Sequence, residues 1–281
     1  MKQILTYTFF FLLTFSFITF AQKDTLNGFW APNASAGISI SQIALSNWTQ
    51  GGENTITWTL IGNGGYEYFS KNWNFRNTLK ITYGRTKLGS QNFRTNDNEL
   101  FIEFVLSKEL GWDVDPFLSN SIRTPITTGY NYKVEPFQKK ADFFDPGYII
   151  QSIGFTYDKH PLFQTRLGFA VQETFTNKYR QYSDDPKTKK TEAFKFETGF
   201  ESVTSFQQFI YDNIIGKSSL RLFTRFENLD VWDVRWENII IAKVNDLLNV
   251  NFDYLLIYKK AQSLDIQIKQ SLQISFIYTI F

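Results

Sequence analysis

Few side chains in this sequence could do chemistry. The only histidine, His160, lies in the segment Asp-Lys-His-Pro, which is typical of a turn. A hydrolytic site needs a nucleophilic serine, a histidine base and an orienting carboxylate or amide within hydrogen-bonding reach. A turn histidine next to Pro161 meets that requirement poorly. We therefore expect a solvated turn residue at position 160 and no enzymatic activity.

Paired carboxylates are the second candidate, because two acidic groups on one face of a sheet can cleave a glycosidic bond by acid–base chemistry. Glu197 and Glu201 share one parity of an alternating segment, and Asp233 and Glu237 share one parity of another. Basic side chains fall on the same inferred face, at Lys195, Arg221, Arg225 and Arg235. A face of mixed sign is better satisfied by ion pairing, so the pattern favours a structural role.

No cofactor and no metal are predicted. The sequence has no cysteine and one histidine, so it cannot build a transition-metal centre from these two residue types. The glycine pair in the segment "TQGGEN" is followed by neither Lys-Ser nor Lys-Thr. A phosphate-binding loop is therefore not expected there.

Two interpretations of that glycine-rich stretch remain open. In the first, Gly51 and Gly52 supply positive φ angles in a tight hairpin, while Glu53 or Asn54 hydrogen-bonds local backbone. In the second, the stretch is a recognition patch for a ligand or a partner. That patch would consist of Trp48, Gly51, Gly52, Glu53 and Asn54.

The first 21 residues are typical of a secretory signal peptide. Lys2 precedes an almost unbroken apolar run that closes on Thr19-Phe20-Ala21, and we predict cleavage after Ala21. The alternative, a retained membrane helix, lacks a basic cluster after the run. No cysteine follows the cut, so a lipid anchor is not expected. The mature domain would span residues 22–281.

The composition excludes a nucleic-acid partner and indicates a strand-rich chain. Lys and Arg number 29 against 27 Asp and Glu, so there is no basic excess. Aromatic residues make up 18% of the chain, although its mean hydropathy is only −0.25. An aromatic-rich yet polar chain fits strands on which apolar and polar residues alternate.

That alternation is clearest in residues 248–258, where every second residue is apolar: Leu248, Val250, Phe252, Tyr254, Leu256 and Tyr258. A period of two predicts a strand with one apolar and one polar face. Many such segments run to about ten residues, as membrane-spanning strands do, whereas soluble strands usually have about five or six. The sequence therefore predicts an all-β fold, a transmembrane antiparallel up-and-down β-barrel.

We predict about twelve strands, and ten or fourteen remain open. Their ranges are 38–49, 54–67, 73–85, 98–109, 117–132, 148–157, 163–176, 193–208, 218–226, 231–243, 247–258 and 266–281. Longer loops at 85–97, 133–147 and 177–191 alternate with shorter connections, which places both termini in the periplasm. The first strand is irregular, since Ile38 and Ile40 lie on one parity and Ile43 and Leu45 on the other. A bulge or a segment outside the membrane would explain it.

Two segments resemble known patterns. The C-terminal "SLQISFIYTIF" ends on Phe281 and resembles the terminal strand that outer-membrane insertion machinery reads, although Thr279 stands where that pattern has an aromatic residue. The segment "ISQIALSNWTQGGEN" resembles a family of exported Bacteroidetes-type proteins known as a domain of unknown function, with an early Trp-x-x-Gly-Gly-Glu/Asp-Asn stretch. The resemblance implies a barrel in the outer membrane of a Gram-negative bacterium. It does not indicate an activity.

The predicted lumen carries charges of both signs: Arg76, Lys80, Glu103, Arg166, Lys195, Glu197, Glu201, Arg221, Arg225, Asp233, Arg235 and Glu237. A barrel of about twelve strands lies between filled barrels of eight and open channels of sixteen. The first hypothesis is a narrow pore or small-solute transport protein. The alternative is a closed barrel acting as a structural or accessory subunit of a larger outer-membrane complex. The expected partners are outer-membrane lipid, the insertion machinery and other outer-membrane proteins.

Overall fold

The computed structural model describes residues 28–47, 49, 52–185, 188–260 and 263–281. The predicted signal peptide, residues 1–21, lies outside the described residues, as do Trp48 and Gly51 of the glycine-rich stretch. Among the described residues, no helix is both long and apolar enough to cross a membrane.

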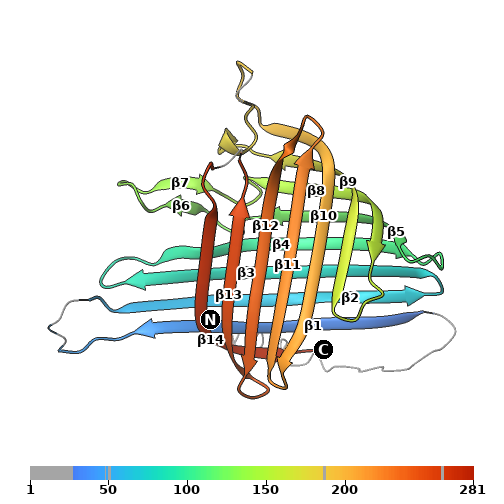
Figure 1. The fold of residues 1–281 in the computed structure, drawn as a ribbon. Helices are drawn as coiled ribbons and strands as arrows, with labels where there is room; N and C mark the ends of the chain where they lie inside the picture. The colour runs from blue at the N-terminus through green and yellow to red at the C-terminus, as the bar shows by residue number, and fades with distance from the viewer. Residues whose placement is uncertain (1–27, 48, 50–51, 186–187, 261–262) are drawn as a thin grey trace, which may run out of the picture.

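Twelve antiparallel strands close into a barrel, in the order β1-β14-β13-β12-β11-β10-β9-β8-β5-β4-β3-β2 (Figure 1). They are β1 (Phe29–Ile43), β2 (Thr55–Ser70), β3 (Trp73–Leu88), β4 (Arg94–Lys108), β5 (Asp115–Thr124), β8 (Gly147–Tyr157), β9 (Phe163–Phe175), β10 (Phe194–Tyr211), β11 (Ile214–Arg225), β12 (Asn228–Lys243), β13 (Leu248–Tyr258) and β14 (Gln267–Thr279). In Figure 1 the strands β10–β14 cross in front of β1–β4. The prediction of a twelve-stranded antiparallel barrel is confirmed.

The predicted bounds of the first strand, 38–49, were wrong, since β1 spans Phe29–Ile43. The bulge considered for this strand is also not found in its pairing with β2. β1 pairs with β2 from Phe29↔Phe69 to Ile43↔Thr55 without a register shift. Ser39 points inward and is buried, so Ile38 and Ile40 point outward. Ile43 shares the parity of Ser39, but it lies at the strand end and is 57% exposed. The apparent slip in apolar phase is therefore the end of the strand.

The prediction of a strand over residues 117–132 was wrong beyond Thr124. The next strand, β6 (Gly129–Asn131), pairs with β7 (Gln138–Ala141) in a separate two-stranded sheet. Pro125 ends the barrel ladder because it has no N–H to donate. The side chain of Asn98 then redirects the chain, since its Oδ1 accepts hydrogen bonds from the N–H groups of Ile126 and Thr127, each at 2.9 Å.

The seam where β1 meets β14 is the shortest ladder of the barrel wall. It pairs six residues of each strand, from Ser35↔Thr279 to Ile40↔Ile274, whereas β1 and β2 pair fifteen. Pro32 lies in the part of β1 that pairs with β2 alone. Its missing N–H therefore leaves the seam intact.

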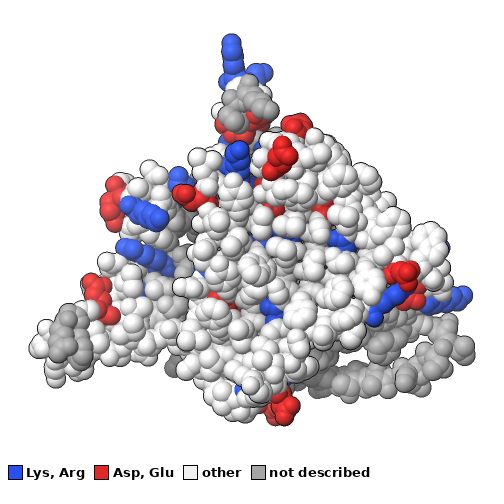
Figure 2. All heavy atoms as spheres, in the orientation of Figure 1, with Lys and Arg blue, Asp and Glu red and all other residues white. Residues whose placement is uncertain are grey.

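The exterior of the barrel is apolar and the interior is polar, the reverse of a soluble fold. On β9, Leu167 is 59% exposed on the outside, while the neighbouring Arg166 is 8% exposed on the inside. Large apolar side chains are exposed along the other strands in the same way, for example Leu118, Ile153 and Leu272. Figure 2 shows a mostly uncharged wall over β11–β13, with charged side chains gathered toward its ends.

The two ends of the barrel differ in their connections. One end, called here the long-loop end, carries residues 44–54, 89–93, 125–146, 176–193, 226–227 and 259–266. The other, the short-turn end, carries residues 71–72, 109–114, 158–162, 212–213 and 244–247. β1 starts and β14 finishes at the short-turn end. The loops predicted to be long thus lie together at one end.

Candidate functional site

Four charged side chains form an ion-paired layer across the middle of the lumen. Glu99 of β4 accepts hydrogen bonds from Arg123 at 2.5 Å and from Arg235 of β12 at 3.0 Å. Arg235 also donates to Glu237 at 2.6 Å, and Arg123 lies 3.9 Å from Glu237. β4 and β12 are opposite strands of the barrel, with five strands between them on either side. We call Glu99, Arg123, Arg235 and Glu237 the diametric layer.

A second cluster lines the wall of β10 and β11. Arg225 makes a bidentate pair with Asp233, at 2.7 and 3.1 Å, and also bonds to Glu197. Arg221 donates to Glu201 at 2.6 Å, and the hydroxyl of Ser152 donates to the same carboxylate. These contacts neutralise the carboxylates that could otherwise have formed an acid–base pair.

The structure places all twelve charged residues that the sequence assigned to the lumen in ion pairs. The pairs beyond those already described are Arg76–Glu67, Lys80–Glu237, Arg166–Glu103 and Lys195–Glu197. Sequence reasoning missed Glu99 and Arg123, the two members of the diametric layer on β4 and β5. The parity of Glu99 with Glu103, and of Arg123 with Ser119 and Ser121, is the signal that could have found them.

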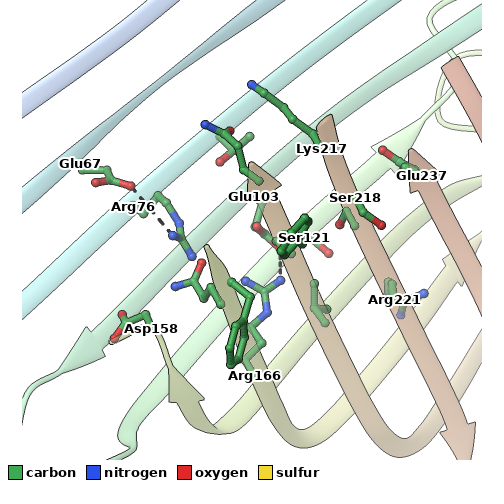
Figure 3. A pocket seen from close by; sticks show the side chains of 18 of the residues that line it. Glu67, Arg76, Glu103, Ser121, Asp158, Arg166, Lys217, Ser218, Arg221 and Glu237 are labelled. Carbon is green, nitrogen blue, oxygen red and sulfur yellow. Dashed lines mark hydrogen bonds and ion pairs between the residues drawn. The ribbon is translucent and has the colours of Figure 1, made fainter. Parts of the chain in front are cut away.

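Two cavities lie within the lumen formed by the described residues. The larger, of about 860 Å³, is lined at its outer rim by the short turns, including residues 158–162. The smaller, of about 290 Å³, lies under the long loops and is lined by Pro125, Pro146 and Tyr182. Arg123 and Arg235 of the diametric layer, together with Ile150 and Arg221, line both cavities and so stand between them. Figure 3 shows the pairs Arg76–Glu67 and Arg166–Glu103 along the larger cavity.

The two longest loops are tied together over the long-loop end. The carboxylate of Asp145 accepts hydrogen bonds from the backbone N–H groups of three successive residues, Asn177, Lys178 and Tyr179, at 3.0, 2.7 and 3.3 Å. The neighbouring Tyr182 lines the smaller cavity, and burial raises the pKa of its phenol above the usual range. The loops thus cover the lumen at this end.

His160 lies in the β8–β9 turn at the rim of the larger cavity. Its Nδ1 accepts a hydrogen bond from the N–H of Leu162 at 3.2 Å, and its ring packs against Phe163 with 4.6 Å between centroids. Among the described residues the imidazole has no serine or carboxylate partner. This geometry is that of a turn residue.

The described part of the glycine-rich stretch bonds to local backbone. Gly52 has a φ of 113°, and the Oδ1 of Asn54 accepts a hydrogen bond from the N–H of Leu45 at 2.6 Å. The carbonyl of Asn54 accepts another from the N–H of Gly89 at 2.7 Å. A recognition role for the patch stays a prediction; its residues are Trp48, Gly51, Gly52, Glu53 and Asn54.

The C-terminal residue Phe281 lies beside β1. Its N–H donates to the carbonyl of Ala34 at 3.4 Å, and its ring is exposed. Recognition of Phe281 by insertion machinery stays a prediction.

Comparisons with known proteins name no activity for this chain. Residues 40–130 match the family described as "Protein of unknown function (DUF3078)", and the match includes the glycine-rich stretch. The comparison with curated proteins finds no match.

Among solved structures, the chain is similar to the translocator domain of the autotransporter NalP from Neisseria meningitidis, at 8% identity and a TM-score of 0.37, over 92% of this chain and 90% of that chain. It is also similar to an outer membrane channel from Pseudomonas putida F1, at 8% identity and a TM-score of 0.40, over 94% and 98%.

Proposed function

We propose that this protein is an outer-membrane β-barrel whose lumen is closed by the diametric layer, and that it acts as a membrane-anchored structural or accessory component. The long-loop end faces the outside of the cell and both termini face the periplasm. The observation that carries the proposal is the ion pairing of Arg235 with Glu99 across the full width of the barrel.

The exterior supports a place in the bilayer. On β9 the outward rings run from Phe163 to Phe175, twelve residues apart. At about 3.4 Å per residue and a tilt of about 45°, they span roughly 29 Å along the barrel axis, near the height of about 25 Å typical of the apolar band of such barrels. Further rings gather at both levels, with Trp58 against Tyr83 toward the long loops and Trp30 against Tyr66 toward the short turns.

Closure follows from the charges of the diametric layer. Two carboxylates and two guanidinium groups neutralise one another there, and each guanidinium lies within ion-pairing distance of both carboxylates. Removing one partner of a buried ion pair costs about 3–5 kcal/mol, because the other charge stays buried and unpaired. The side chains of the diametric layer are 17–31% exposed, so a permeating ion would have to separate them against a cost between that value and the roughly 0–1 kcal/mol of an exposed pair.

A second candidate function is a small-solute pore that opens when the diametric layer separates. The cavities favour this candidate, because space of about 860 Å³ and about 290 Å³ lies directly on the two sides of the layer. Arg123 and Arg235 of the layer line both cavities, so their movement would bring the two spaces together.

Conductance in planar bilayers distinguishes the two candidates. We expect the purified wild-type protein to show no discrete conductance. The double variant Glu99→Ala/Arg235→Ala removes the cross-lumen pair without a net change of charge, and we expect it to conduct. The matched control is Glu67→Ala/Arg76→Ala, which removes a pair between the neighbouring strands β2 and β3. Steady conductance by the wild type would contradict closure and support the pore.

A further inference from the structure

Three arginines at the long-loop end have no carboxylate partner among the described residues, and two of them line one cleft. Six of the nine arginines form ion pairs: Arg76, Arg123, Arg166, Arg221, Arg225 and Arg235. Arg180 donates instead to the carbonyls of Asn177 and Thr191. Within the described residues, Arg85 and Arg94 have no carboxylate partner. Both line the same cleft.

This cleft has a volume of about 820 Å³ and lies outside the lumen network, between the β3–β4 hairpin and the segment that contains β6. Its wall is rich in aromatic rings, from Tyr83, Phe93, Tyr130, Tyr132 and Phe137. We call it the arginine–aromatic cleft. Its volume falls within the range of about 300–1,000 Å³ that is typical of sites for small molecules.

The rings hold the two guanidinium groups in place. Arg94 lies 5.4 Å from the ring centroid of Tyr132 and 5.1 Å from that of Phe137. Arg85 lies 5.9 Å from the ring of Phe93. The phenol of Tyr132 is itself fixed, because it accepts a hydrogen bond from the N–H of Thr95 at 2.9 Å. The charges are therefore positioned before any ligand arrives.

Several hydrogen-bond donors of these arginines are unused. Arg85 donates through Nη2 to the carbonyl of Phe93 at 2.5 Å, but its Nε is buried without a partner. The guanidinium of Arg94 lies near the two rings and has no ion-pair or hydrogen-bond partner among the described residues. A buried donor without an acceptor is unfavourable, and guanidinium groups pair most strongly with carboxylates and phosphates. An anionic group bound in the cleft would supply acceptors for these donors.

We propose that the arginine–aromatic cleft binds an acidic saccharide. The carboxylate or phosphate of the sugar pairs with Arg85 and Arg94, and the C–H face of the sugar ring packs on Tyr132 and Phe137, whose ring faces are electron-rich. Glu135 also lines the cleft and accepts hydrogen bonds from sugar hydroxyls, which a bare anion does not offer. The proposed orientation of the barrel places this site on the cell surface, where the saccharide is either a lipopolysaccharide headgroup or a free oligosaccharide.

Calorimetric titration of the detergent-solubilised full-length mature protein tests the proposal. The probes are trigalacturonate, the neutral galactotriose and inorganic phosphate. We expect trigalacturonate to bind at least about tenfold more tightly than either of the other two, because a charge-assisted bidentate pair and ring packing act together only on it. Equal affinities for trigalacturonate and galactotriose would overturn the proposal.

Variants separate the two halves of the site. Arg94→Gln should lower the affinity for trigalacturonate by about tenfold or more, as expected for the loss of one charge-assisted contact. The matched control, Arg180→Gln, removes the same charge from the loop between β9 and β10 and should leave the affinity for trigalacturonate unchanged. Phe137→Ala should weaken trigalacturonate but not phosphate. If Phe137→Ala leaves trigalacturonate binding intact, the cleft binds anions only and the saccharide assignment is wrong.

The source of the saccharide is resolved in nanodiscs. If the site binds a lipopolysaccharide headgroup, lipopolysaccharide in the disc should block the binding of trigalacturonate. The wild-type protein should then retain lipopolysaccharide in preference to phospholipid, and the Arg94→Gln variant should not. If lipopolysaccharide leaves trigalacturonate binding unchanged, the ligand is a free acidic oligosaccharide. Neither result depends on conductance, so this inference and the closed lumen fail separately.

Discussion

At the scale of single residues, Arg225 shows what an alternating pattern does and does not predict. Its parity with Arg221 predicts the lumen face, and the structure places its guanidinium there between Glu197 and Asp233. Its partners could not be predicted, because they depend on the register of three strands. That register shifts between Thr224 and Arg225, and the sequence carries no turn or glycine signal for this bulge.

Loss of this arginine should destabilise the barrel strongly. Arg225→Gln leaves the buried carboxylates of Glu197 and Asp233 without their shared partner, and we expect the free energy of unfolding to fall by about 3–5 kcal/mol. Urea titration of the protein refolded in lipid vesicles measures the effect. Arg76→Gln is the control, since it breaks one longer pair, 3.9 Å, with more exposed partners and should cost about 0–1 kcal/mol. Equal losses would show that ion pairing does not stabilise this lumen.

At the scale of elements, strands with a clear period of two could be predicted nearly to their ends. β13 is an example, predicted at 247–258 and observed at Leu248–Tyr258. β1 could not be predicted in its first half, "FWAPNASAG", because small residues hide the alternation and the partner β2 defines the strand. The β6–β7 hairpin was missed because the turn before it depends on Asn98 of β4, which lies 28 residues earlier in the sequence.

The faces of β13 give a prediction at this scale. Phe252 points outward between Ile240 and Leu272, whereas Asp253 points inward near Ser271. Phe252→Arg should lower the free energy of unfolding by about 2–4 kcal/mol, since it places a charge near the bilayer midplane. Asp253→Asn keeps the size of an inward polar side chain and should be tolerated. A refolding titration in vesicles compares them, and a reversed ranking would contradict the assignment of faces.

At the scale of the whole molecule, the apolar exterior and polar interior are those of a membrane barrel, and ion pairs cross its lumen. The alternation in the sequence was enough to predict the barrel. The candidate site could be predicted only in part from the sequence, because the diametric layer joins Glu99 and Arg235, which are 136 residues apart. The arginine–aromatic cleft was not predictable, since it is formed by two hairpins whose packing leaves no periodic signal.

The prediction at this scale concerns the location of the mature protein in the cell. We expect the mature protein to begin at Gln22, to fractionate with the outer membrane and to need detergent for extraction, because exposed apolar strands require lipid. N-terminal sequencing and membrane fractionation measure this. A companion in fixed ratio after mild extraction would support the accessory role. Recovery as a soluble periplasmic protein would contradict both the membrane assignment and the accessory role.

The short seam has a consequence for the order of assembly. β1 and β14 come from the two ends of the chain, and six residue pairs join them. Every other wall ladder joins wall strands that are consecutive in the sequence, so we expect those ladders to form early and this ladder to form last. Arg235 can meet Glu99 only after the sheet has curled, so the charges of the lumen remain hydrated until then. We therefore expect completion of the seam and pairing of the diametric layer to be one late event in folding.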